Sequence, residues 1–133
     1  MQQKILHKTL LIIQGIYSLV TAVWALVDIK TFMMVTGPKT DIWLVKTVAV
    51  LLIPISTSLL LSAFFVSTFW QPMIVGLLSA IGLAVIDFYY SGNDTISKIY
   101  MWDGIAQCIF VCWWLFIIIA RRRSFTRGTT NAA

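Results

Sequence analysis

Two aspartates and a lysine are the residues of this chain whose types and positions could do chemistry. Asp87 lies just before a polar break between two apolar segments, Asp103 lies just after it, and Lys46 has a similar position in an earlier segment. A helix rises about 1.5 Å per residue, so the three side chains would reach similar depths on three separate helices. If they meet, two carboxylates around one ammonium leave one acid in excess. Crowding and burial would suit that acid to proton exchange or acid/base work.

The same three residues also have a structural interpretation. Lys46 would neutralise one carboxylate, neighbouring hydroxyls would satisfy the other, and the network would fix the register of the helices. Lys46 has an alternative of its own, because a lysine near the end of an apolar segment can extend its amine to the lipid head groups. The sequence leaves these interpretations open.

Four further polar residues extend the candidate site. Asp28 and Asp41 lie nearer the water, whereas Gln14 and Gln107 lie deeper in their segments. Gln107 is one helical turn beyond Asp103 and continues a polar track inward, so Asp103 is our first choice as the proton carrier or acid/base, ahead of Asp87. The candidate ligand-binding set is Gln14, Asp28, Asp41, Lys46, Asp87, Asp103 and Gln107.

The thiols and the histidine predict neither a metal site nor a cofactor. Cys108 and Cys112 lie four residues apart in an apolar run, where small packing residues are the expected interpretation. His7 is the only histidine and lies in the N-terminal flank, so a haem with paired histidines inside the membrane is excluded. The motifs of hydrolases, nucleotide-binding proteins, zinc proteases and CxxC redox proteins are missing from the sequence.

The composition is that of a membrane protein. Of the 133 residues, 59% are hydrophobic and only 11% are charged, whereas a soluble domain has about 25% charged residues. Ten Lys and Arg against five acids give a net charge of +5. The bases lie mostly at the ends of the chain, where anionic lipid head groups attract them, so nucleic acid is not expected as a partner.

The apolar segments predict an all-α fold, an integral membrane four-helix bundle in a single domain over residues 1–123. The four predicted spans are about 9–27, 41–66, 72–90 and 100–120. We read the first as a retained helix and not as a signal peptide, because its apolar stretch is long. The connection 28–40 has an apolar middle that suits a short interfacial helix. Residues 124–133 are predicted to form a disordered cytoplasmic tail.

Two features inside the spans predict local structure. Pro54 cannot donate a backbone hydrogen bond and should kink the second helix, with nearby hydroxyls satisfying the disturbed backbone. Gly76, Ala80 and Ala84 form a ridge of small residues, a pattern common where helices pack in membranes. Such a ridge offers a packing surface for a second copy of the chain.

The charges also predict an orientation. Lys4, Lys8 and the run 121–123 lie at the two ends of the chain. The positive-inside rule therefore places both termini in the cytoplasm and all five aspartates at the outer face.

The layout resembles that of small bacterial four-helix inner-membrane proteins of the DoxX-like kind. The resemblance covers most of the chain as architecture: four spans, both ends inside, and a Gly-Pro break before a second helix that reads TDIWLVKTV. It implies a location in the bacterial inner membrane and assigns no activity and no functional residue.

These observations lead to three functional hypotheses. The first is a membrane protein whose outward-facing polar and acidic pocket binds or passes a small solute or a lipid head group, with membrane lipids around it and a homo-oligomeric assembly. The alternative is a membrane enzyme that uses Asp87 or Asp103 as acid/base on a lipid-like substrate. The second alternative is an accessory subunit of a larger membrane complex.

Overall fold

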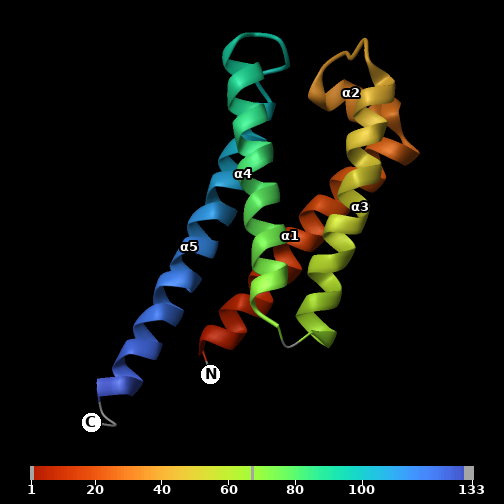
Figure 1. Ribbon diagram of the computed structural model, residues 1–133. Helices are drawn as coiled ribbons and strands as arrows, with labels where there is room; N and C mark the ends of the chain where they lie inside the picture. The colour runs from red at the N-terminus through yellow and green to blue at the C-terminus, as the bar shows by residue number, and fades with distance from the viewer. Residues whose placement is uncertain (1, 67, 131–133) are drawn as a thin grey trace.

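The computed structural model describes residues 2–66 and 68–130, with side chains placed as far as Arg123. Over these residues the regular structure is entirely helical (Figure 1). The helices are α1 (Gln2–Val27), α2 (Ile29–Thr36), α3 (Ile42–Phe65), α4 (Trp70–Gly92) and α5 (Tyr100–Thr130).

Four of these helices are long and apolar enough to cross a membrane, namely α1, α3, α4 and the Tyr100–Arg123 part of α5. They correspond to the four segments that the sequence predicts as spans, and α3 begins and ends one residue inside its predicted segment. Two boundaries differ by more. α1 begins at Gln2, before the predicted residue 9, and α5 runs to Thr130, through most of the segment predicted as a disordered tail. Residues 131–133 of that tail lie outside the described residues.

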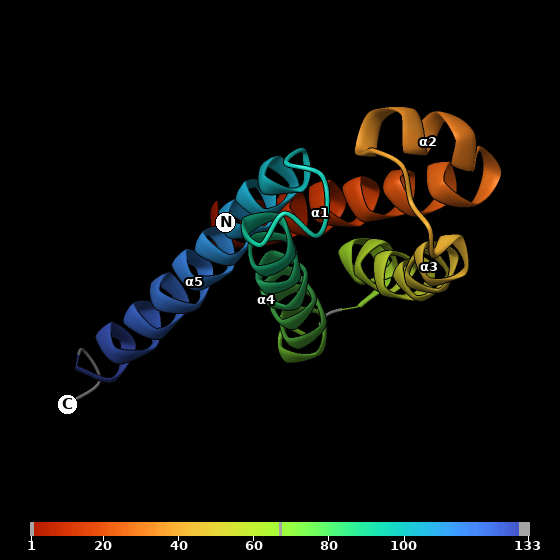
Figure 2. The ribbon, with the colours of Figure 1, turned by 90° about the horizontal axis from the view of Figure 1, so that it is seen from above.

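The long helices are arranged as two pairs. α1 packs along α3, and α4 packs along α5, while α1 also contacts α5 and α4. α5 points away from α3 toward the C-terminus, so the helices diverge instead of forming an evenly packed bundle (Figures 1 and 2). Both termini lie at one end of the molecule. α2 and the α4–α5 turn lie at the other end, which we call the outer end (Figure 1).

Small residues allow the close approach of the helices. A Cβ atom on Gly76 would lie 2.7 Å from the indole ring of Trp114, and one on Gly15 would lie 2.8 Å from Leu60. Ala80 and Ala84 are also buried. The predicted ridge of small residues is therefore used for packing within the chain, so it does not leave a free surface for a second copy.

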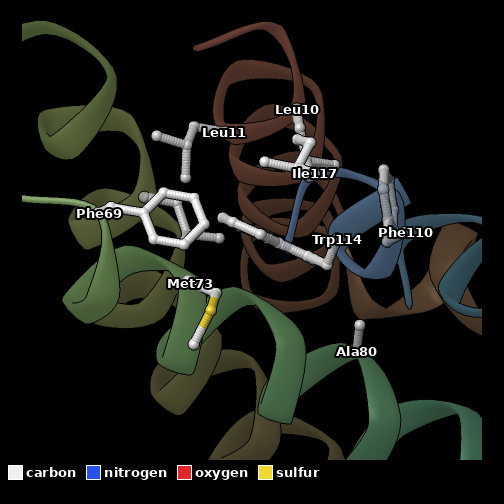
Figure 3. Close-up of a cluster of buried hydrophobic side chains, with 9 residues drawn as sticks. Leu10, Leu11, Phe69, Met73, Ala80, Phe110, Trp114 and Ile117 are labelled. Carbon is white, nitrogen blue, oxygen red and sulfur yellow. The ribbon is translucent and has the colours of Figure 1, made fainter. Parts of the chain in front are cut away.

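The largest buried cluster joins α1, α4 and α5 toward the end that holds the termini. Trp114 is completely buried at its centre, between Leu10, Phe69 and Met73 (Figure 3). Burying these large apolar side chains within the chain holds the α4–α5 pair against α1.

The predicted short helix and the proline both take defined places. α2 begins after Asp28, whose side chain accepts a hydrogen bond from the Thr31 backbone N–H, and it buries Phe32. α3 continues as a helix through Pro54. The Ser56 hydroxyl donates to the Leu52 carbonyl, whereas the carbonyl that loses its helical donor at Pro54 is that of Val50. The predicted support of the backbone at the proline stays a prediction.

Candidate functional site

Asp103 accepts hydrogen bonds from the side chains of two other residues. It lies in the first turn of α5, where the positive end of the helix dipole favours a negative charge. Its Oδ1 atom accepts a hydrogen bond from the Tyr17 hydroxyl of α1. The same atom accepts a second one from Gln107 Nε2 at 3.3 Å. Gln107 itself is only 2% exposed, so this hydrogen-bonded group extends into the interior as the sequence predicts.

Asp87 meets Asp103 across the α4–α5 pair. Its side chain is 4% exposed, and the two carboxyl groups interact electrostatically. The Oδ2 atom of Asp87 is buried and has no hydrogen-bond partner among the described residues. Most buried polar atoms in folded proteins are paired, so an unpaired carboxylate oxygen is an unusual and informative feature.

Lys46 does not join the two acids. Its side chain is exposed on α3, and it forms no ion pair with Asp87 or Asp103. The reason is the pairing of the helices, because α3 packs against α1 while both acids lie on the α4–α5 pair (Figure 2). The structure therefore leaves Lys46 outside the acid pair, and the extension of its amine to lipid head groups stays a prediction.

The two remaining aspartates of the candidate set lie at the outer surface. Both are exposed, and neither approaches the Asp87–Asp103 pair. The hydrogen bond from the Thr31 N–H lowers the pKa of Asp28, which identifies this residue as the cap of α2. Asp41 precedes the first residue of α3 without forming a side-chain cap.

Gln14 belongs to a second buried polar cluster, separate from the acids. Its Nε2 atom donates to the Gly76 carbonyl at 2.7 Å, and its Oε1 atom accepts from Trp114 Nε1 at 2.9 Å. These contacts join α1, α4 and α5 deep in the molecule. Gln14 thus has a packing role in this structure and does not contact the acid pair.

Tyr17 is the site residue that the sequence analysis missed. It is the only tyrosine of the predicted span 9–27, and it lies three residues from Gln14 on the polar side of α1. A phenolic hydroxyl one turn from Gln14 was the available signal, although Ser18 and Thr21 carry hydroxyls in the same segment. Its donation to Asp103 shows that α1, and not α3, supplies the third helix of the site.

The α2–α3 connection covers the outer side of the site. Gly37 has a φ of +87°, and a Cβ atom there would lie 3.1 Å from Cβ of Ser97 in the α4–α5 turn. The Lys39 amine lies 4.6 Å from the centre of the Tyr100 ring and donates to the Thr36 carbonyl at 2.9 Å. Tyr100 is one turn before Asp103 on α5. We call Thr36, Gly37, Lys39, Ser97 and Tyr100 the outer cover.

An open hollow of about 380 Å³ lies at the α2–α3 connection. Its lining residues are Met33, Met34, Gly37, Pro38 and Lys39, and none of the acid-pair residues is among them. Partial burial at this position lowers the pKa of Lys39. The hollow therefore lies beside the cover and does not open onto the two carboxylates.

The cysteines and the histidine lie away from the acid pair. Cys108 and Cys112 are free and exposed on α5. His7 packs against the rings of Phe69 and Trp114, at centroid distances of 5.1 and 5.5 Å. Within residues 2–66 and 68–130, no group of three or more His, Cys, Asp or Glu side chains is placed to hold a metal ion.

No protein-family model, curated protein or solved structure matches this chain. The fold and the site define its class: over the described residues the regular structure is helical, four helices are apolar enough to cross a membrane, and a buried carboxyl group (Asp87) lies beside a partly buried one (Asp103) near one end of them.

Proposed function

We propose that this is a multi-pass membrane protein of the bacterial inner membrane that binds a small, positively charged solute at the Asp87–Asp103 pair. Large apolar side chains are exposed along all four long helices, which suits contact with lipid. The layout that resembles DoxX-like proteins supports the choice of membrane. Both termini would be cytoplasmic, so the acid pair would lie near the outer face.

The observation that supports this function is the unpaired Oδ2 atom of Asp87. A buried acceptor without a donor costs free energy, about 1–3 kcal/mol and more if it is charged. Tyr17 and Gln107 both donate a hydrogen bond to Asp103, and neither donates one to the Oδ2 atom of Asp87. The partner that is missing from the site is therefore a hydrogen-bond donor or a cation, and a solute with both properties would complete it.

Thermal unfolding of the detergent-solubilised protein tests the proposal. The probes are the chloride salts of methylammonium, guanidinium, choline and tetramethylammonium, with sodium chloride at equal ionic strength and glycerol as references. At least one organic cation should raise the melting temperature of the native protein in a saturable manner. Asp87→Asn should abolish this rise.

Asp94→Asn is the matched control, because Asp94 is exposed and forms its 2.6 Å ion pair with Lys98 in the outer turn. It should leave the response to the cation unchanged. The absence of a saturable shift with every cation, or an equal loss in both variants, would contradict the proposed site. Chemical conversion of a co-purified lipid, lost in Asp87→Asn, would instead favour a membrane enzyme.

The orientation has its own test. A variant with Cys108→Ala and Cys112→Ala provides a thiol-free background, to which Asn93→Cys or Ser124→Cys is added singly. A membrane-impermeant maleimide applied from outside should label the first variant and leave the second unlabelled in intact cells. Labelling of Ser124→Cys alone would reverse the proposed topology.

A further inference from the structure

We infer that the Asp87–Asp103 pair holds one shared proton, exchanges it with the outer solution, and releases it when the positively charged solute binds. This inference rests on the proposed function and deepens it. It makes the site a proton-for-cation exchange site, in which the proton is the ligand of the solute-free state.

The hydrogen bonds of the site support a single proton. Ionised carboxylates only accept hydrogen bonds. Asp103 has two donors, Tyr17 and Gln107, whereas Asp87 Oδ2 has none. A proton on Asp87 would turn that carboxyl into a donor toward its neighbour Asp103. One proton therefore removes the only defect in the hydrogen bonding of this group, and a second proton has no acceptor to satisfy.

The charges around the pair support the same state. The titratable groups that act on Asp87 are Asp103 on α5, Tyr17 on α1 and Tyr100 on α5, and none of these is a cation. The nearest candidate cations are engaged or distant: Lys39 lies on the Tyr100 ring, Lys98 pairs with Asp94, and Lys46 is exposed on α3. The described residues thus supply no positive charge to the pair.

A buried carboxylate (Asp87) beside a partly buried one (Asp103), without a counter-ion, does not stay ionised together with it. Their mutual repulsion and the loss of hydration disfavour the doubly charged state, as in other carboxyl pairs that share a site. The proton is also the one cation that needs no cavity. The described hollow is not lined by either carboxylate, so a larger cation requires neighbouring side chains to move.

Polar groups lie one turn above Asp87 toward the outer end, although none of them is hydrogen-bonded to its Oδ2 atom, and the Lys98 amine donates to the Ser91 carbonyl at 2.9 Å. Ser91 lies one turn above Asp87, is completely buried, and its hydroxyl donates to the Ser97 carbonyl at 3.4 Å. Ser97 and Tyr100 belong to the outer cover. A proton that leaves Asp87 therefore meets hydroxyl and carbonyl groups on the way outward, whereas the opposite direction leads to the apolar cluster around Trp114 (Figure 3).

The exchange step is balanced in atoms and charge. The O–H bond of the protonated carboxyl breaks, its electron pair stays on the carboxylate, and the proton passes to water. The incoming cation then lies against two carboxylates, and its charge replaces the one that the proton had supplied. No oxidant, reductant or covalent intermediate is needed.

Difference infrared spectroscopy on the solute-free protein provides the main test. At about pH 6 an ordinary aspartate, with a pKa of about 3.9, is ionised and shows no protonated C=O band. The native protein should show one such band at this pH and lose it on further alkalinisation. Asp87→Asn should remove the band. Asp103→Asn should let the band disappear at a lower pH than in the native protein, because the repulsion between the two carboxyl groups is gone while Asp87 stays buried. Asp94→Asn should keep the band. A native protein without the band, or a band that persists in Asp87→Asn, would overturn the inference.

The second measurement is the release of protons on solute binding. It uses the native protein, so its result does not depend on whether a variant folds. Methylammonium chloride is added to the native protein in weak buffer with a pH-indicator dye. About one proton per bound cation should appear in solution. Saturable binding without release would overturn the exchange and leave the proposed function standing. If the infrared band is present but no organic cation binds, the result supports the shared proton and contradicts the proposed binding of a cationic solute.

Discussion

The molecule contains two buried polar clusters that differ in one respect. In the Gln14 cluster, the amide nitrogen donates to the Gly76 carbonyl and the amide oxygen accepts from Trp114. Both functional atoms of the side chain are thus satisfied. In the acid cluster, Tyr17 and Gln107 satisfy Asp103, yet one oxygen of Asp87 has no donor.

This difference distinguishes the structural role of the Gln14 cluster from the ligand-binding role that we propose for the acid pair. A fully paired polar group fixes how helices pack and gains nothing from a ligand. An incompletely paired buried group is destabilised until a proton or solute completes it. We therefore expect substitutions in the Gln14 cluster to affect stability, and substitutions of Asp87 to affect binding with little cost to stability.

The largest expected effect is that of Gly76→Ala. The new Cβ atom would lie 2.7 Å from the ring of Trp114, which is completely buried and has no room to move. Overpacking of this kind costs about 1–3 kcal/mol, and we expect the upper part of that range. The measurement is the free energy of unfolding in detergent, by denaturant titration.

Gly82→Ala on the same helix is the matched control. A Cβ atom at Gly82 meets nothing within 4 Å. Alanine should therefore be neutral or stabilise the helix by up to about 1 kcal/mol. Equal destabilisation by both substitutions would mean that the α4–α5 contact at Trp114 is not the cause.

Gln14→Leu should have the next largest effect. It keeps the approximate volume of the side chain but removes two hydrogen bonds and leaves the Trp114 N–H without an acceptor. With about 0.6 kcal/mol for an average hydrogen bond between membrane helices, the expected loss is about 1–2 kcal/mol. Solute binding at the acid pair should persist at unchanged affinity. A selective loss of binding with full stability would assign Gln14 to the functional site instead.

The two acids should differ when each is replaced by asparagine. Asp103→Asn weakens the charge-assisted hydrogen bonds from Tyr17 and Gln107 and should cost about 1 kcal/mol. Asp87→Asn supplies an amide donor where the proton is inferred, so its stability should stay within about 0.5 kcal/mol of the native value. Denaturant titration of the two variants side by side checks this order. The reverse order would place the unsatisfied oxygen on Asp103.

Lys46→Ala should change little. The side chain is exposed and has no ion pair with either acid, so the free energy of unfolding should remain within about 0.5 kcal/mol. Cation binding should also be unaffected. A large loss that is partly recovered by adding Asp87→Asn would show that Lys46 contacts the acids, because only interacting residues give such coupling.

The smallest effect is expected at the cap of α2, and it depends on pH. The Thr31 N–H lowers the pKa of Asp28 in the folded state. The ionised cap therefore contributes stability above the unfolded pKa of aspartate, and this contribution is lost as the pH falls through the lower folded value. Asp28→Asn keeps the accepting oxygen without the charge. Its melting temperature should be slightly below that of the native protein at neutral pH and equal to it in acid.

The sequence alone determined the helices, their approximate bounds and the placement of the polar residues along them. Long apolar runs between polar breaks specify helices because each run satisfies its own backbone hydrogen bonds, whatever the tertiary arrangement. The pairing of Asp87 with Asp103 was also predictable. The two residues flank one short turn, and a short turn forces the helices on either side to run antiparallel and in contact.

The tertiary structure alone decided which third helix approaches the acids. One of the two interpretations of the sequence put Lys46 of α3 in that place, whereas in the structure Tyr17 of α1 contacts Asp103. Helix pairing depends on the shapes of whole faces, such as Gly15 below Leu60 and Gly76 below Trp114. Such complementarity is not a local property of any segment. For the same reason, the unpaired oxygen of Asp87 is invisible in the sequence, because whether a donor reaches it depends on side chains of two other helices.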